Sequence, residues 1–413
     1  MRGLRALLLL ASMCAASSAV RAQSPDKAPD KAPEKAASAT NASTSAPSTA
    51  PTPAPAAPSG GGASLAASAA PAASVASAAP ASPPNRRWLS TPRVYGRLGV
   101  QDLGVVINVD DPYSVQVGEY YIRARKVPED QVLRLSLPVR GTLTPSEFED
   151  FRKQVDAFYG DRVQALALTW RLPYAVNCHA ITGALAMGFD PQLCANTCGA
   201  GRLSRYFASP STKPHKDLGM RLSMLLAARD VDAAKALIDR GVKSDGTLGL
   251  RGGLPANVHF VTTSDSVRSV RQSLFPPAGP VPKLGLDVFL DQTDALRGSE
   301  RVLMYLTGRA SVDWIESVQF LPGALADHLT SFGGVLDKPH GQMTVLAWIH
   351  AGATASYGTA SEPCAHLQKF PHPQALLVFY VQGATALEAY WKSVAWPQQG
   401  LFVGEPLAAP FGR

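Results

Sequence analysis

The first 85 residues most restrict what this chain can fold into, because they hold few large apolar side chains outside one short run. Such a segment cannot bury enough apolar surface to offset the conformational entropy lost on ordering. After the first 22 residues come three Pro-Asp/Glu-Lys-Ala repeats, and then mostly Ala, Pro and Ser around Gly60-Gly61-Gly62. We therefore predict that 23–85 is a disordered, partly extended tether that acts as a spacer.

Residues 1–22 have the three parts of a secretory signal peptide. Arg2 and Arg5 supply the charge, an apolar run follows to about residue 16, and Val20-Arg21-Ala22 offers a cleavage site. The run is shorter than the roughly 20 residues that span a bilayer. We expect a secreted or periplasmic protein with no integral membrane segment after cleavage. Cys14 could carry a lipid instead, but the bulky Met13 before it disfavours that alternative.

Residues 86–413 are rich enough in apolar side chains to form a core, and their pattern is typical of an α/β fold. Short apolar runs predict strands over 105–109, 132–135 and 163–169, and helices are expected over 114–126 and 144–159 between them. Thr144, Pro145 and Glu147 form a capping box at the second helix start. The alternation predicts a mostly parallel sheet with flanking helices.

The same alternation continues to the end of the chain. It predicts helices over 231–240, 342–350, 376–381 and 387–394, and strands over 259–262, 287–290, 301–306, 324–329, 353–357 and 401–403. The less regular stretch 173–214 is expected to be an excursion from the sheet, tied down by crosslinks. The globular part forms either one region or two subdomains, about 86–250 and 251–413.

The charge pattern and the glycine-rich motifs exclude several functions. Three of the positive charges behind the net charge of +7, Arg2, Arg5 and Arg21, lie in the leader, so the mature chain carries +4 (7 − 3). This charge is mild and no block of Lys and Arg stands out, so we expect no nucleic-acid partner. The sequence has no GxxxxGK[ST] phosphate loop and no GxSxG nucleophile elbow. We expect no cofactor.

Four cysteines lie outside the leader: Cys178, Cys194, Cys198 and Cys364. An even number in an oxidising compartment favours disulfides, and four cysteines allow three pairings that the sequence does not distinguish. Cys178, Cys194 and Cys198, together with His179, also offer ligands for zinc. The spacing does not give two CxxC knuckles, so a disulfide among them is the preferred prediction.

His328 and Cys364 are candidate catalytic residues, because a cysteine peptidase needs a thiolate beside an imidazole. His328 is expected at the end of one strand and Cys364 in the loop after the next, so both would lie at one edge of a parallel sheet. Asp327 or Glu362 would then orient the imidazole. The alternative is that Cys364 is in a disulfide and His328 is an ordinary polar group.

Acidic side chains also stand at or near predicted strand ends, where paired carboxylates could bind a metal or act as acid and base. Asp110 and Asp111 precede Pro112, however, and Asp before Pro is a common turn former. The turn is the preferred interpretation. The acidic residues concerned are Asp110, Asp111, Asp265, Asp313 and Glu405.

Several C-terminal runs, and the stretch 108–126, resemble an uncharacterised family of secreted bacterial proteins. The likeness extends over about 96–413 and excludes the leader and the tether. Members of this family occur in genomes that carry exosortase, a membrane enzyme that sorts proteins to the envelope or matrix. The resemblance implies an envelope or matrix partner, and no activity. The runs are 322–331, 351–359, 362–364, 369–371, 389–394 and 400–407.

The chain is more distantly similar to gingipain-like and caspase-like peptidases, which also tend to close with a Gly-Asp-Pro-Leu-like turn, as at 404–407. Such folds place a His-Gly after one strand and the cysteine after the next. In one register these positions hold Arg309 and Thr330-Ser331, and both catalytic residues are lost. In the other register, His328 and Cys364 form the pair, but His328 lacks the following Gly.

Two functions therefore stay open. The preferred one is a non-catalytic envelope-associated or matrix-associated protein on a caspase-like scaffold. The alternative is a cysteine peptidase with His328 as base and Cys364 as nucleophile. Whether Cys364 is a free thiol distinguishes the two.

Overall fold

The computed structural model describes residues 86–338 and 340–413. The predicted leader, 1–22, and tether, 23–85, lie outside the described residues. Within those residues, no helix combines the length and apolarity that crossing a bilayer would require.

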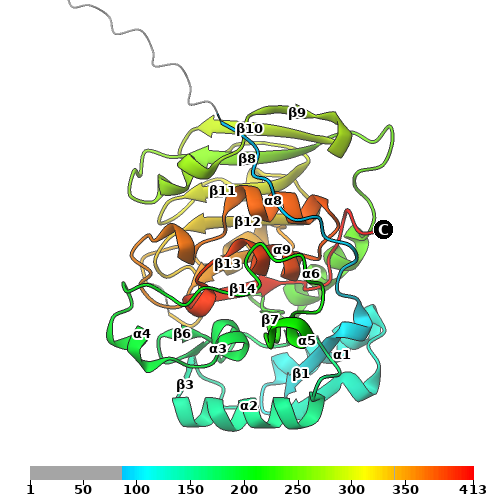
Figure 1. The fold of residues 1–413 in the computed structure, drawn as a ribbon, viewed down its shortest axis with the longest axis vertical. Coiled ribbons are helices and arrows are strands. Elements are labelled where there is room, and N and C mark those ends of the chain that lie inside the picture. Colours follow the sequence, from blue (N-terminus) through cyan, green and yellow to red (C-terminus); the bar gives the residue numbers. More distant parts are fainter. Residues whose placement is uncertain (1–85, 339) are drawn as a thin grey trace, which may run out of the picture. The chain divides into compact units, whose positions relative to one another are not determined.

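One sheet of eleven strands runs through the described residues in the order β2-β1-β4-β7-β14-β13-β12-β11-β8-β10-β9 (Figure 1). Its first block is fully parallel, with β14 beside β7. The strands of this block are β1 (Leu103–Asn108), β2 (Val132–Leu135), β4 (Ala165–Leu168), β7 (Leu222–Leu225) and β14 (Gly400–Gly404).

A second parallel block runs in the opposite direction, because β13 and β14 pair antiparallel. The sheet closes with β9 antiparallel to β10, and the other neighbours in this block are parallel. The expected mostly parallel α/β fold is therefore confirmed. The remaining strands of the sheet are β8 (Ala256–Thr262), β9 (Gly279–Val281), β10 (Leu286–Gln292), β11 (Val302–Gly308), β12 (Phe320–Leu329) and β13 (Ala355–Thr359).

Helices cover both faces of the sheet. Adjacent residues of β11 and β12 belong to different apolar clusters, with Leu325 in the main core and Ala326 in a smaller one around Tyr305 and Trp348. Because successive strand residues point to opposite faces, the two clusters lie on opposite sides of the sheet. The helices are α1 (Pro112–Arg125), α2 (Pro145–Tyr159), α3 (Ile181–Met187), α4 (Pro191–Ala195), α5 (Pro214–Leu218), α6 (Val231–Ser244), α7 (Val345–Ala351), α8 (Pro373–Val381) and α9 (Ala386–Ser393).

The segment 86–99 crosses α8 and α9 as an extended strap, drawn blue in Figure 1. Its backbone N–H groups donate to helix side chains: Leu89 to Gln374 Oε1 at 2.6 Å and Leu98 to Glu388 Oε2 at 3.1 Å. The strap satisfies its own donors in this way and holds the start of the globular part against the helices.

The stretch 173–214 leaves the main sheet, as expected. Its strands β5 (Ala175–Val176) and β6 (His179–Ala180) join the earlier strand β3 (Thr142–Leu143) in a small sheet, and α3 and α4 follow. Two disulfides tie it down, Cys178–Cys194 and Cys198–Cys364. The predicted disulfides are confirmed, and the second one joins the excursion to the loop after β13.

The main differences from the sequence-based boundaries have local causes. The first helix was expected to begin at Ser114, but Asp111 caps it by accepting a hydrogen bond from Tyr113 N at 3.0 Å. The helix expected to end at Gly241 continues as α6 to Ser244. A Cβ at Gly241 would lie 2.5 Å from Glu405 Cγ, so this glycine allows close packing and does not end the helix.

Candidate functional site

The carboxyl ends of β11, β12 and β13 are neighbours, and this is where parallel α/β sheets collect their functional residues. The edge carries a small cavity of about 240 Å³. Both predicted catalytic residues belong to this region, since His328 is in β12 and Cys364 follows β13. The cavity is lined by Val267, Arg268, Leu329, Thr330, Ser331, Glu362, Pro363, Cys364 and Ala365.

His328 is buried under this edge, with 1% of its surface exposed, and both ring nitrogens are occupied. Nδ1 accepts a hydrogen bond from the indole N–H of Trp348 at 2.9 Å. Nε2 lies 2.9 Å from the carbonyl oxygen of Met343, so it carries the proton and donates. Burial lowers the pKa of His328 to about 4. The ring is therefore neutral at physiological pH and has no free lone pair for a base.

Cys364 is bonded to Cys198, 166 residues earlier in the chain. Its backbone N–H donates to Glu362 Oε1 at 2.8 Å. Cys364 and Ala365 have φ angles of 58° and 53°, a left-handed pair that turns the loop sharply. The structure therefore holds no free thiol at position 364. The assignment of His328 and Cys364 as a catalytic pair remains a prediction.

In the other register, the positions expected for the catalytic histidine and cysteine lie at the ends of β11 and β12. Arg309 follows β11 and forms an ion pair with Asp294 at 2.8 Å. Thr330 follows β12 and donates from Oγ1 to Gln342 Oε1 at 2.6 Å, and Ser331 lines the small cavity. Neither Arg309 nor the pair Thr330-Ser331 supplies an imidazole or a thiol.

The two carboxylates expected to orient the imidazole have other partners. Asp327 is 1% exposed and forms an ion pair with Arg271 at 2.7 Å, and Arg271 is itself 2% exposed. Arg271 also donates from Nη2 to Thr307 O at 2.6 Å. Glu362 accepts the N–H of Cys364. Both side chains hold the edge together and neither contacts the ring of His328 through a hydrogen bond.

The candidate zinc residues do not form a thiolate site. The donor atoms of Cys178, His179 and Cys194 lie within 4.8 Å of one another, but the two cysteines are joined by a disulfide. Zinc needs deprotonated thiolates, which a disulfide does not offer. Nε2 of His179 lies 3.0 Å from Asp190 O, and Cys198 is paired with Cys364.

The acidic residues at strand ends are dispersed. Asp111 caps α1, Asp265 pairs with Arg268 at 2.8 Å, and the buried Glu405 accepts from Tyr121 at 2.8 Å and Arg125 Nε at 2.9 Å. Within 86–338 and 340–413, no set of three carboxylates lies close enough to share a cation. The turn interpretation of Asp111 fits the structure.

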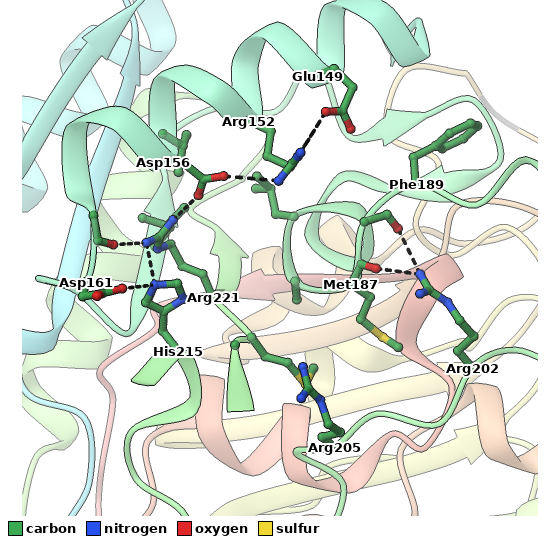
Figure 2. Close-up of a pocket in the computed structure, with 18 of the residues that line it drawn as sticks. Glu149, Arg152, Asp156, Asp161, Met187, Phe189, Arg202, Arg205, His215 and Arg221 are labelled. Carbon is green, nitrogen blue, oxygen red and sulfur yellow. Dashed lines mark hydrogen bonds and ion pairs between the residues drawn. The ribbon is translucent and has the colours of Figure 1, made fainter. Parts of the chain in front are cut away.

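Sequence reasoning missed the larger cavity, of about 820 Å³, between α2, the end of α3 and the start of β7 (Figure 2). Its only sequence signal was the density of Arg, Lys and His over 202–221. The charged side chains that line it are Glu149, Arg152, Asp156, Asp161, Arg202, Arg205, His215 and Arg221, and the large apolar ones are Val155, Leu166, Leu185, Met187, Phe189, Leu203 and Met220.

Comparison with known proteins gives a distant likeness in structure. No protein-family model matches the chain, and no curated protein matches it. The crystal structure of the Arg-specific cysteine proteinase gingipain R is similar over 76% of this chain and 80% of that one, at 10% sequence identity and a TM-score of 0.39. This similarity assigns no residue and no activity to the present chain.

Proposed function

We propose that this chain is an exported, non-catalytic binding protein of the bacterial envelope or extracellular matrix, in a setting that includes an exosortase-type sorting system. The leader pattern of residues 1–22 supports export. Two disulfides are typical of proteins in oxidising compartments. The exosortase setting rests on the resemblance of 96–413 to the secreted bacterial family.

One observation carries the non-catalytic part of the proposal: Cys364, which lines the cavity at the carboxyl edge, is in a disulfide. A cysteine peptidase needs the thiolate as its nucleophile. In the other register, Arg309 and Thr330 stand at the strand ends, and neither replaces the missing thiolate. The edge keeps a cavity for binding, and the one cysteine that lines it is held in a disulfide, which supports a role in binding.

The alternative, a cysteine peptidase using His328 and Cys364, is supported by the neighbouring parallel strands β12 and β13 that carry or precede the two residues. It requires that the Cys198–Cys364 bond be reduced in the working protein. It also requires that His328 give up its hydrogen bond from Trp348 before Nδ1 could accept a proton.

Disulfide mapping with an activity assay tests the choice. The full chain is exported to a periplasm, purified without reductant, alkylated and digested, and its crosslinked peptides are weighed. We expect a Cys198–Cys364 peptide, no labelling by a peptidyl chloromethyl ketone, and no hydrolysis of a mixed peptide library. Hydrolysis should also be absent from a second sample reduced with dithiothreitol, the state that the alternative requires. Hydrolysis that is lost in both Cys364→Ala and His328→Ala, and kept in Cys178→Ala, would establish the peptidase instead.

The sorting part is tested separately, by following the chain in an exosortase-carrying host and in the same host without the exosortase gene. We expect its distribution between periplasm, envelope and medium to change. An unchanged distribution would remove the exosortase connection and leave the binding role in place.

A further inference from the structure

We infer that the 820 Å³ cavity between α2, α3 and β7 is a binding site for a short peptide segment that bears a carboxylate. The inference deepens the proposed function, because it names a ligand class for a binding protein. Ligand pockets commonly range from about 300 to 1,000 Å³. This cavity shares no lining residue with the small one at the carboxyl edge.

One wall of the cavity is a ladder of paired charges, visible in Figure 2. Arg152 lies between Glu149 at 3.0 Å and Asp156 at 3.3 Å. Arg221 donates to the other oxygen of Asp156 at 2.6 Å, and its Nη2 lies 2.9 Å from Nε2 of His215. Glu149 and Asp156 therefore have guanidinium partners, whereas the exposed Asp161 pairs with His215 at 3.2 Å, so this wall keeps one carboxylate without a guanidinium partner.

Arg221 also has a structural task, because its Nη2 donates to the carbonyl oxygen of Gly160 at the end of α2. Carbonyl groups at a helix C-terminus lack intrahelical partners and favour a cation. The side chain is 5% exposed, so it belongs to the fold of this wall. A ligand would contact the outer groups of the ladder and not displace it.

The opposite wall carries two guanidinium groups, and within the described residues only one carboxylate, that of Asp190, pairs with either of them. Arg202 donates from Nη2 to Met187 O at 2.6 Å, and its nearest carboxylate oxygen, on Asp190, is 3.8 Å away. Arg205 lies beside Gly219 at the end of α5, and among the described residues it makes no hydrogen bond or ion pair. Both side chains are exposed at the cavity. This wall therefore has unmatched positive charge.

Unmatched guanidinium groups favour a carboxylate, which the planar fork of arginine binds through paired hydrogen bonds. The apolar part of the lining indicates what the carboxylate is attached to. Leu203, which lies between Arg202 and Arg205 in the sequence, is 66% exposed, and Met187 and Phe189 are further apolar residues of the lining. The ligand thus combines an anionic group with apolar side chains.

The charge ladder favours a peptide over a hydrocarbon chain. A fatty acyl chain laid along Glu149, Arg152 and Asp156 would remove water from these groups and return no hydrogen bond, which costs free energy. A peptide backbone has both N–H donors and carbonyl acceptors, so it can satisfy the outer atoms of the ladder while its side chains cover the apolar surface.

Calorimetric titration of the full chain tests the inference with three matched probes, the N-acetylated and C-amidated peptides Leu-Ala-Leu-Glu, Leu-Ala-Leu-Gln and Leu-Ala-Leu-Lys, and with octanoate. We expect the Glu peptide to bind about tenfold more tightly than the Gln peptide, because the charged hydrogen bonds are lost in the amide. The Lys peptide should bind no better than the Gln peptide.

The variant Arg205→Gln should reduce the affinity for the Glu peptide to that for the Gln peptide. Arg251→Gln removes an exposed arginine that does not line this cavity and should bind like the unaltered chain. Arg205 is exposed and pairs with no group in the part of the chain that the structure describes, so its replacement should leave the melting temperature unchanged.

Three results would overturn the inference: no heat from any peptide at millimolar concentration, equal affinities for all three peptides, or binding of octanoate alone. An equal loss in Arg251→Gln and Arg205→Gln would also overturn it. Failure here removes the ligand class only, because the absence of catalysis is decided by the peptide-library assay of the proposed function.

Discussion

Both ring nitrogens of His328 are engaged, and this makes its protonation unfavourable in the folded chain. Protonation of Nδ1 would lose the hydrogen bond from Trp348 and place a charge in a site with 1% exposure. The residue type predicted a base, but its surroundings make it a neutral core side chain.

The stability of the chain should consequently fall on acidification through the range in which only the unfolded chain takes up this proton. The pKa of His328 is 6.5 when exposed and about 4 in the fold. The free energy of unfolding therefore decreases as the pH falls from about 6.5 to about 4. The decrease amounts to at most about 3 kcal/mol by pH 4. Urea denaturation at pH 7 and pH 4.5 measures it.

In His328→Asn this part of the pH dependence should disappear, and in the exposed control His350→Asn it should remain. Other histidines with burial-lowered pKa values, His179, His215 and His372, contribute a slope that both variants keep. Equal slopes in the two variants would contradict the account of His328.

The Arg271–Asp327 pair is a second residue-scale feature, since both partners are almost fully buried. Removing one partner leaves the other charged and unpaired in the core. We expect Asp327→Ala to lower the free energy of unfolding by about 3–5 kcal/mol, measured by urea denaturation.

The double variant Arg271→Met with Asp327→Leu removes both charges and should recover most of that loss. A single variant within about 1 kcal/mol of the unaltered chain would show that the pair is not desolvated in solution.

At the scale of single elements, some helix ends are determined by neighbouring residues in the sequence and others by tertiary packing. The capping box of α2 appears as the sequence predicts, with Thr144 Oγ1 accepting from Glu147 N and Glu147 accepting from Thr144 N at 2.8 Å. Its end at Gly160 is also local. The end of α6 was not predictable locally, because Gly241 is explained only by Glu405, far away in the sequence.

Replacing Gly241 in α6 by alanine should change the stability in the opposite direction to the usual effect. Gly to Ala in a helix interior normally stabilises by about 1 kcal/mol. Gly241→Ala should instead destabilise, because the new methyl group would lie 2.5 Å from Glu405 Cγ and disturb the buried bonds from Tyr121 and Arg125. Thermal melts decide between these expectations, and an increase in melting temperature would refute the packing argument.

At the scale of the whole molecule, the antiparallel β13–β14 pair joins the two parallel blocks of the sheet. The C-terminal strand β14 therefore joins the N-terminal block, so one sheet passes through both expected subdomains. The Cys198–Cys364 bond makes a second connection between early and late parts of the chain. The division at about residue 250 remains a prediction.

The two disulfides should differ in their contribution to stability, because they close loops with sequence separations of 166 and 16 residues. The chain-entropy relation gives about 5 kcal/mol for the long loop and about 3 kcal/mol for the short one. We expect the Cys198→Ser/Cys364→Ser variant to unfold at lower urea concentration than Cys178→Ser/Cys194→Ser. The reverse order would show that strain or denatured-state structure outweighs loop entropy.

Much of the fold could be predicted from the sequence, because strand runs, capping boxes and turn residues act over a few neighbouring residues. Strands such as β1, β2 and β12 were placed to within a few residues on these signals. Two disulfides could be expected from the cysteine count, but their pairing depends on which loops the sheet order brings together.

The candidate sites were decided by the tertiary structure. A sequence shows that His328 and Cys364 exist, but burial, the Trp348 bond and the partner Cys198 determine whether they are free to react. The 820 Å³ cavity is likewise lined by α2, the end of α3 and the start of β7, which are far apart in the chain. Propensity is local, whereas charge pairing and desolvation depend on distances in space that only the folded chain sets.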